Sequence, residues 1–288
     1  MKSFIFSHSD ARVGSLMMAI AMLSIPIVDG LAKYLSADFS PLFISWARYA
    51  VASCIIIPIA LGRFGGSIFP SSQLGAHFFR TLCLVTAMTL YFLALSQIPM
   101  ATATSAFFIS PIVATALAVF IAKEKFTWPK LVSLGLGLCG MLLIAKPGVS
   151  IEPGVLLAVA AGVAFAVYLV ATRLASQNTD PIKTLTFQCI VGSLLLLPQA
   201  LWAWELPTTE FYLLFGVLGI ISVSSHLLSI AAFRYAHTSV LAPLVYLELV
   251  GAVAIGYFVY NDLPSITIMA GAALIVIGGL VVTVYSTD

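Results

Sequence analysis

The chain has 288 residues, of which 61% are hydrophobic and only 8% are charged, and its mean hydropathy is +1.11. A soluble domain carries about 25% charged residues, so this chain lacks the polar residues that would coat a water-soluble fold, and its apolar surface must face lipid. The formal net charge is +2 and the basic residues form no run, which argues against nucleic acid as a partner.

Ten stretches of the chain, taken in order, are apolar and long enough to cross a membrane. A helix needs about 20 apolar residues to span about 30 Å of hydrocarbon. We predict spans at residues 14–35, 41–61, 76–96, 100–122, 129–146, 153–174, 182–203, 211–233, 238–260 and 264–285. The runs are continuous, which favours helices over the short alternating strands of a membrane barrel. The predicted fold is therefore an all-α polytopic membrane protein with ten transmembrane helices.

The distribution of Lys and Arg predicts the orientation of these spans. If residues 1–13 lie in the cytoplasm, ten of the basic residues fall on the cytoplasmic side, and only Lys33 and Lys146 fall on the outer side. Cytoplasmic loops of membrane proteins carry the excess of Lys and Arg. We therefore expect both termini to be cytoplasmic.

The two halves of the chain resemble each other at a nearly constant separation. Matching pairs stand 140 or 138 residues apart: Gly14 and Gly154, Pro41 and Pro181, Pro58 and Pro198, Glu124 and Asp262, Gly140 and Gly278. We predict a first repeat at 14–146, a linker at 147–152 and a second repeat at 153–285. Because each repeat has five spans, the second must be inverted relative to the first. Inverted repeats are typical of transporters, with the substrate site near the midplane.

One stretch of the first repeat carries a family resemblance. Residues 101–143 read ATATSAFFISPIVATALAVFIAKEKFTWPKLVSLGLGLCGMLL. This resembles the end of an EamA-type repeat of the drug/metabolite transporter superfamily, with a small-residue helix around Pro111, an acidic residue at its end (Glu124) and a glycine-rich closing helix. The resemblance covers nearly the whole chain in two copies. In the second copy Pro243 lies earlier in its helix, and Asp262 replaces the glutamate.

The resemblance implies a multi-pass protein of the bacterial inner membrane that works by alternating access. Its central cavity is expected between spans 1, 3, 4, 6, 8 and 9. The ten-span layout is most similar to bacterial amino-acid exporters, whereas other members of the superfamily take up S-adenosylmethionine or carry nucleotide sugars.

Four ionisable residues inside spans are the strongest site candidates: Asp29, Arg48, His226 and Glu248. A charge at the middle of the bilayer costs about 2.5–3.5 kcal/mol on insertion scales, so it needs a partner or a wet cavity. Asp29 and Arg48 have a similar estimated depth, so an ion pair is the structural alternative to substrate binding. Glu248 lies near the bilayer centre and is the favoured binding residue. For His226, simple packing is the alternative.

Further candidates are less specific. Tyr91, Tyr168 and Tyr246 carry hydroxyls that need a partner in a dry interior, and Trp46 and Ser110 complete the predicted site. Three prolines within spans are expected to kink helices around a cavity, although plain tolerance of proline is the alternative: Pro26, Pro111 and Pro243. Arg80 and Lys33 lie near span ends, where they are expected to snorkel to the interface.

These residues suit a small zwitterion, so the predicted function is export of amino acids. The alternative is uptake of S-adenosylmethionine or a nucleoside-type metabolite, with Glu248 binding a cationic substrate. A membrane-embedded enzyme that uses His226 is less favoured because neighbouring serines point about 100° away, and a non-transporting structural protein would have no cavity. We expect no catalytic residue, metal or cofactor. The expected partners are a small-molecule substrate and the lipid bilayer, with the chain a monomer or homodimer.

Overall fold

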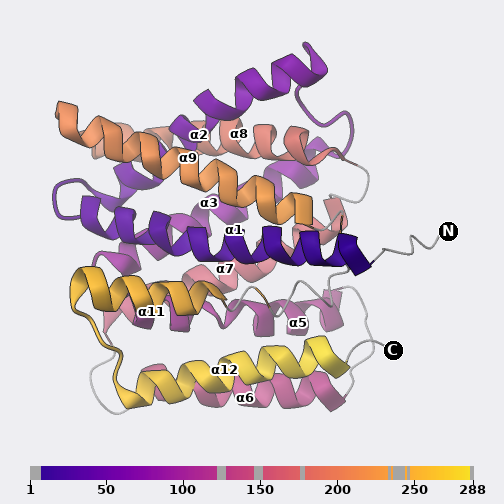
Figure 1. The fold of residues 1–288 in the computed structure, drawn as a ribbon, viewed down its shortest axis with the longest axis vertical. Coiled ribbons are helices and arrows are strands. Elements are labelled where there is room, and N and C mark those ends of the chain that lie inside the picture. The colour runs from indigo at the N-terminus through magenta and orange to yellow at the C-terminus, as the bar shows by residue number, and fades with distance from the viewer. Residues whose placement is uncertain are drawn as a thin grey trace.

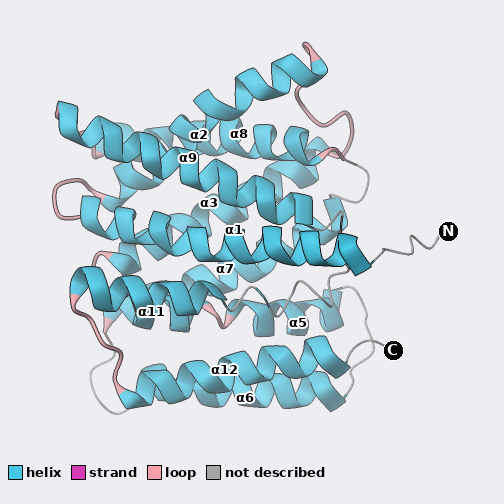
Figure 2. Ribbon diagram, viewed as in Figure 1, coloured by secondary structure: helices cyan, strands magenta, loops and turns pink. Residues whose placement is uncertain are grey.

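The computed structural model describes residues 8–121, 128–145, 152–175, 179–232, 235, 244 and 247–285. Within these ranges the regular secondary structure is helical and no strand is present (Figure 2). The helices of the first half are α1 His8–Leu35, α2 Pro41–Phe64, α3 Leu74–Leu95, α4 Met100–Phe107, α5 Ser110–Ile121 and α6 Trp128–Ala145. Those of the second half are α7 Pro153–Ala175, α8 Pro181–Trp202, α9 Thr209–Ala232, α11 Leu247–Tyr260 and α12 Ile266–Tyr285.

Six of these helices, α1, α2, α3, α7, α8 and α9, contain stretches long and apolar enough to cross a membrane, and α11 and α12 contain shorter apolar stretches. The prediction of an all-helical membrane protein is confirmed. The predicted ninth span, 238–260, is described as helix only over α11, because 236–243 and 245–246 lie outside the described residues.

The structure divides the predicted fourth span into two shorter helices. α4 ends at Phe107 and α5 begins at Ser110, with Phe108 and Ile109 in a turn between them. Pro111 is the second residue of α5 and has no N–H, so it cannot donate the helical hydrogen bond to the carbonyl of Phe107. The predicted span 100–122 is therefore interrupted next to Pro111, where a kink was expected.

Equivalent positions of the two halves start helices in the same way. Pro41 and Pro181 are the first residues of α2 and α8, where the missing N–H of proline has no cost. The preceding residues, Ser40 and Asp180, cap these helices by accepting a hydrogen bond from the N–H two residues later. The proline match seen in the sequence therefore marks two equivalent helix starts.

The helices pack in pairs that join the two halves. α1 lies beside α9, α3 beside α7, α2 beside α8 and α6 beside α12, and α11 packs on α1 and α4 (Figure 1). In the two repeats α1 corresponds to α7 and α3 to α9, so the α1–α9 and α7–α3 pairs are equivalent to each other. The α2–α8 and α6–α12 pairs each join two equivalent helices. Small residues permit close approach: a Cβ on Gly140 of α6 would lie 2.5 Å from the carbonyl oxygen of Gly271 in α12.

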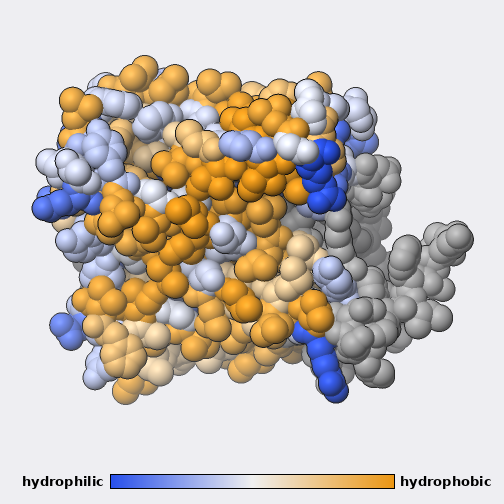
Figure 3. Space-filling view, turned by 45° about the horizontal axis from the view of Figure 1, so that its top comes forward, coloured by the Kyte–Doolittle hydropathy of each residue, from blue (hydrophilic) through white to orange (hydrophobic). Residues whose placement is uncertain are grey.

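Hydrophobic residues cover much of the molecular surface. Figure 3 shows them across the middle of one face, with hydrophilic residues gathered toward the two edges. Large apolar side chains are exposed on several helices, including Leu16, Leu194 and Phe258. Such extended apolar surface is stable against lipid and not against water, so the outer surface agrees with a multi-pass membrane protein.

Candidate substrate site

Charged side chains from four helices are buried inside the bundle. Asp29 of α1, Arg48 of α2, Arg80 of α3 and Glu248 of α11 expose only 3%, 6%, 2% and 7% of their surface. Buried charges are stable only when they are hydrogen-bonded, paired or able to meet a ligand. These four residues therefore mark the polar interior of the molecule.

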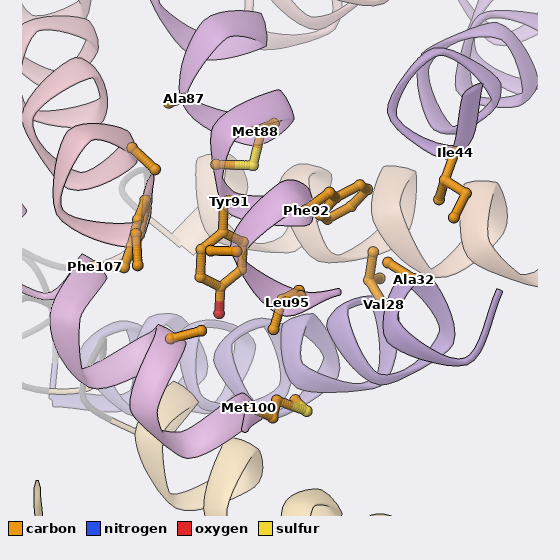
Figure 4. Packing of buried hydrophobic residues seen from close by; sticks show 14 of the residues in the cluster. Val28, Ala32, Ile44, Ala87, Met88, Tyr91, Phe92, Leu95, Met100 and Phe107 are labelled. Atoms are coloured by element: carbon orange, nitrogen blue, oxygen red, sulfur yellow. The ribbon is translucent and has the colours of Figure 1, made fainter. Parts of the chain in front are cut away.

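Asp29 is held by hydroxyl groups. The hydroxyl of Tyr91 on α3 donates to Asp29 Oδ2 over 3.4 Å and lies 2.8 Å from Thr104 Oγ1 on α4. The Tyr91 ring lies in an apolar core near Met88 and Phe107 (Figure 4). The structure thus brings together two predicted site residues, Asp29 and Tyr91, on adjacent helices.

The alternative of an ion pair between Asp29 and Arg48 is wrong. Within the described part of the chain no ion pair joins them, because the guanidinium turns toward other helices. Arg48 Nε donates to Ser222 Oγ at 2.8 Å, and Nη1 donates to Met88 Sδ at 3.3 Å. Asp29 and Glu248 nevertheless both lie within electrostatic range of Arg48.

Glu248 lies in the first turn of α11, where the helix N-terminus favours a negative charge. It is also within electrostatic range of Asp29. One turn later, a Cβ on Gly251 would lie 2.7 Å from Pro26 Cγ, so α11 packs tightly on α1. This close packing holds the two carboxylates in one region of the interior.

The side chain of Arg80 lies elsewhere than predicted. It does not snorkel to the interface, since it is buried and Nη2 donates to the hydroxyl of Tyr168 at 3.1 Å and to Gln188 Oε1 at 3.0 Å. Its guanidinium also lies 5.2 Å from the centre of the Tyr168 ring. The position of Arg80 along α3 was predictable from the sequence, but the direction in which its side chain points was not. A sequence signal for a buried polar partner was Gln188, which is a polar residue inside a span and stands 140 residues after Arg48.

Lys33 also differs from the expectation. Its Nζ donates to the carbonyl oxygens of Leu95 and Ile98, at 3.1 and 2.8 Å, and so satisfies carbonyls at and just beyond the C-terminal end of α3. It lies 5.5 Å from the ring centre of Tyr260, whose hydroxyl donates to the carbonyl of Gly30. These contacts tie α1, α3 and α11 together near their ends.

Aromatic rings connect the two polar regions. Tyr91 and Phe107 have ring centres 4.9 Å apart, Phe107 and Phe165 5.1 Å, and Phe165 and Tyr168 5.3 Å. This aromatic path runs from the region of Asp29 to the region of Arg80. It offers π faces on which a flat or cationic ligand group can bind.

A small pocket lies between α2, α8 and α9. Its free volume is about 10 Å³, room for about one water molecule. Its lining residues are Arg48, Tyr49, Ala52, Leu185, Gln188, Cys189, Ser222, Val223 and His226. His226 Nδ1 lies 2.9 Å from the carbonyl oxygen of Ser222. Two predicted site residues, Arg48 and His226, therefore face the same space.

The remaining candidates are dispersed. Trp46 stacks near Phe43 and Trp204, with ring centres 5.6 and 5.4 Å away, in a packing cluster apart from the pocket. Ser110 is buried at the first residue of α5. Tyr246 and Pro243 lie outside the described residues.

Comparison with known proteins identifies the class. The model of the EamA-like transporter family matches residues 12–146 and again 152–284. The chain therefore belongs to the EamA-like transporter family, in agreement with the resemblance to the drug/metabolite transporter superfamily. It is a multi-pass protein of the bacterial inner membrane and a transporter of small metabolites.

Individual relatives have names that state a substrate. An S-adenosylmethionine uptake transporter of Rickettsia conorii is 29% identical over 89% of this chain and 87% of the relative, and one of Rickettsia bellii is 28% identical over 89% and 88%. A riboflavin transporter of Vibrio cholerae is 25% identical over 95% and 94%. A crystal structure with a TM-score of 0.65 and 19% identity covers 96% of both chains and shows the shared fold.

Proposed function

We propose that this chain is a secondary carrier for the uptake of S-adenosylmethionine. The observation that carries the proposal is the burial of two carboxylates, Asp29 and Glu248, within electrostatic range of a single arginine, Arg48. S-adenosylmethionine bears two cationic groups, a sulfonium and an ammonium, and one carboxylate. The two acids can bind the permanent cation of the sulfonium, Arg48 can bind the carboxylate, and the aromatic path can stack on the adenine ring.

The alternatives fit the interior less well. An amino acid has one ammonium and one carboxylate, but it has no second cationic group for the two buried acids and no flat ring for the aromatic path. Riboflavin has no cationic group to place beside either acid. The relatives named for S-adenosylmethionine uptake favour the uptake alternative over export of amino acids.

The transport mechanism follows from the repeats. Pairs of equivalent helices from the two halves meet across the interior, which supports an inverted arrangement in which one half rocks against the other. The break between α4 and α5 places irregular backbone inside the bundle, where neighbouring helices bury it. The sequence contains no phosphate-binding loop of the Walker type, so the driving force is a solute gradient or exchange.

Counterflow in liposomes tests the proposal. Purified protein is reconstituted with unlabelled S-adenosylmethionine inside, and entry of the radiolabelled compound is followed. Riboflavin and a panel of amino acids serve as competing substrates, and protein-free liposomes as the control. We expect S-adenosylmethionine to exchange and riboflavin to remain outside. Exchange of riboflavin or an amino acid without S-adenosylmethionine would contradict the proposal.

A further inference from the structure

We infer that the pocket between α2, α8 and α9 binds the α-aminocarboxylate head group of the substrate. Arg48 and Gln188 would bind its carboxylate, and His226 would bind its ammonium. The inference rests on the proposed function, because S-adenosylmethionine carries this head group, and it assigns that group a defined place in the interior.

The orientation of Gln188 is set by Arg80. Arg80 Nη2 lies 3.0 Å from Gln188 Oε1, and an arginine can only donate hydrogen bonds. The amide oxygen must therefore face Arg80, which leaves the two N–H donors of the amide directed elsewhere. Gln188 lines the pocket, and its amide nitrogen has no hydrogen-bond partner in the described part of the chain. Arg80 is thus a positioning residue that makes Gln188 a donor toward the pocket.

Arg48 supplies a cation at the same pocket. Its Nε and Nη1 are occupied by Ser222 and Met88. Among the residues that the structure describes, Nη2 has no partner, and the side chain lines the pocket. The guanidinium is held on two sides and keeps a charged donor for a carboxylate.

His226 supplies an acceptor. Its Nδ1 lies 2.9 Å from the carbonyl oxygen of Ser222, and a carbonyl can only accept, so Nδ1 carries the proton. In a neutral imidazole the other nitrogen, Nε2, is then an acceptor. Ser222 contacts both Arg48, through its hydroxyl, and His226, through its carbonyl. Ser222 therefore holds the charged donor of Arg48 and the acceptor nitrogen of His226 at the same pocket.

The chemistry of the side chains that line the pocket specifies the ligand group. Charged and neutral donors on one side and an acceptor on the other match a carboxylate and an ammonium on adjacent atoms. The free volume of the pocket is about 10 Å³, room for about one water molecule, so the head group would enter only after the lining side chains move apart. The sulfonium and adenosyl parts would extend toward Asp29, Glu248 and the aromatic path.

Competition by two related compounds tests the inference. S-adenosylmethionine and its decarboxylated analogue, which keeps the amine, compete against labelled S-adenosylmethionine in counterflow. For wild type we expect the carboxylate to improve inhibition at least about tenfold, because a polar site rejects a ligand that leaves its donors unpaired. Arg48→Gln and Gln188→Met should weaken inhibition by S-adenosylmethionine alone and bring the ratio toward one. His226→Leu should weaken inhibition by both compounds equally, because both contain the ammonium.

Ser225→Ala is the matched control. Ser225 is buried on α9 like Ser222, but it donates to the carbonyl of Ile221 in its own helix and does not line the pocket. In Ser225→Ala the ratio of inhibition by the two compounds should equal that of wild type. If Arg48→Gln does not fold, Gln188→Met, which removes no charge, carries the test.

The outcomes separate the two proposals. Equal inhibition by both compounds in wild type, or an unchanged ratio in Gln188→Met, overturns the head-group site and leaves the proposed function standing. Failure of S-adenosylmethionine to exchange overturns the proposed function. In that case methionine, which has the same head group, is tested instead. If methionine exchanges and Gln188→Met weakens its binding, the site is upheld. If methionine does not exchange, the site is overturned as well.

Discussion

At the scale of single residues, the interior separates positive from negative charge. Asp29 and Glu248 lie on α1 and α11, whereas Arg48 and Arg80 lie on α2 and α3. The two acids are close enough to interact with each other, an arrangement that is unfavourable unless a cation lies near. Arg48 lies within range of both acids, and a substrate with cationic groups would relieve the repulsion further, so we predict a role in binding for the carboxylates.

Neutralising Glu248 tests that role. Glu248→Gln keeps the size of the side chain and its hydrogen-bonding groups but removes the charge. We expect the half-saturating concentration of S-adenosylmethionine to rise by about tenfold or more, as on removing one partner of a buried charge pair, while the pH profile keeps its shape. Uptake into liposomes at several pH values measures both quantities.

The control for this change is Glu210→Gln, which neutralises an exposed acid on α9 and should transport like wild type. If Glu248→Gln flattens the pH profile and spares counterflow, the carboxylate carries protons. If affinity, rate and pH profile all equal those of wild type, Glu248 is a packing residue.

At the scale of helices, the break between α4 and α5 is held by its neighbour α7. A Cβ at Gly162 of α7 would lie 2.6 Å from the carbonyl oxygen of Phe107, the last residue of α4. That carbonyl is the one that Pro111 leaves without a helical donor. Gly162 therefore lets α7 approach irregular backbone that no larger residue could meet without displacing it.

Gly162→Ala should destabilise the protein, because the methyl group meets rigid backbone. Overpacking of this kind costs roughly 1–3 kcal/mol, measured as a lower melting temperature in detergent. Gly216→Ala in α9 is the matched control, since nothing lies within 4 Å of its added Cβ, and helix propensity favours alanine by up to about 1 kcal/mol. Equal melting temperatures for the two variants would show that α7 moves aside easily.

At the scale of the whole molecule, the paired helices and the basic residues predict how the chain lies in the membrane. Ser71, between α2 and α3, and Glu205, between α8 and α9, are exposed in loops. The excess of Lys and Arg places the first loop in the cytoplasm and the second outside. The two loops should therefore face opposite sides of the bilayer.

Cysteine labelling tests this orientation. In a background without the four native cysteines, Glu205→Cys should react with an impermeant maleimide added to intact spheroplasts. Ser71→Cys should react only after permeabilisation. Labelling of both positions from outside would contradict the inverted repeat, and the opposite pattern would place the termini outside.

Helix positions were largely predictable because hydropathy and turn residues act locally. The predicted starts at Pro41 and at residue 182, for example, lie at or next to the starts of α2 and α8. The membrane location, the family and the repeated organisation also follow from such local patterns. A kink at Pro111 was expected, but a complete break into two helices was not, because proline weakens a helix without showing whether it bends or ends.

The sequence by itself determined the position of each residue along its helix, because each residue adds about 1.5 Å along the axis. It did not determine direction, because the face that a side chain presents depends on which helices pack against it. Asp29 and Arg48 have similar estimated depths yet form no ion pair, and Arg80, near a helix end, is buried against Tyr168 and Gln188. Only the tertiary structure could turn Arg48, Gln188 and His226 toward one pocket, because they come from three helices that meet only when the two halves pack.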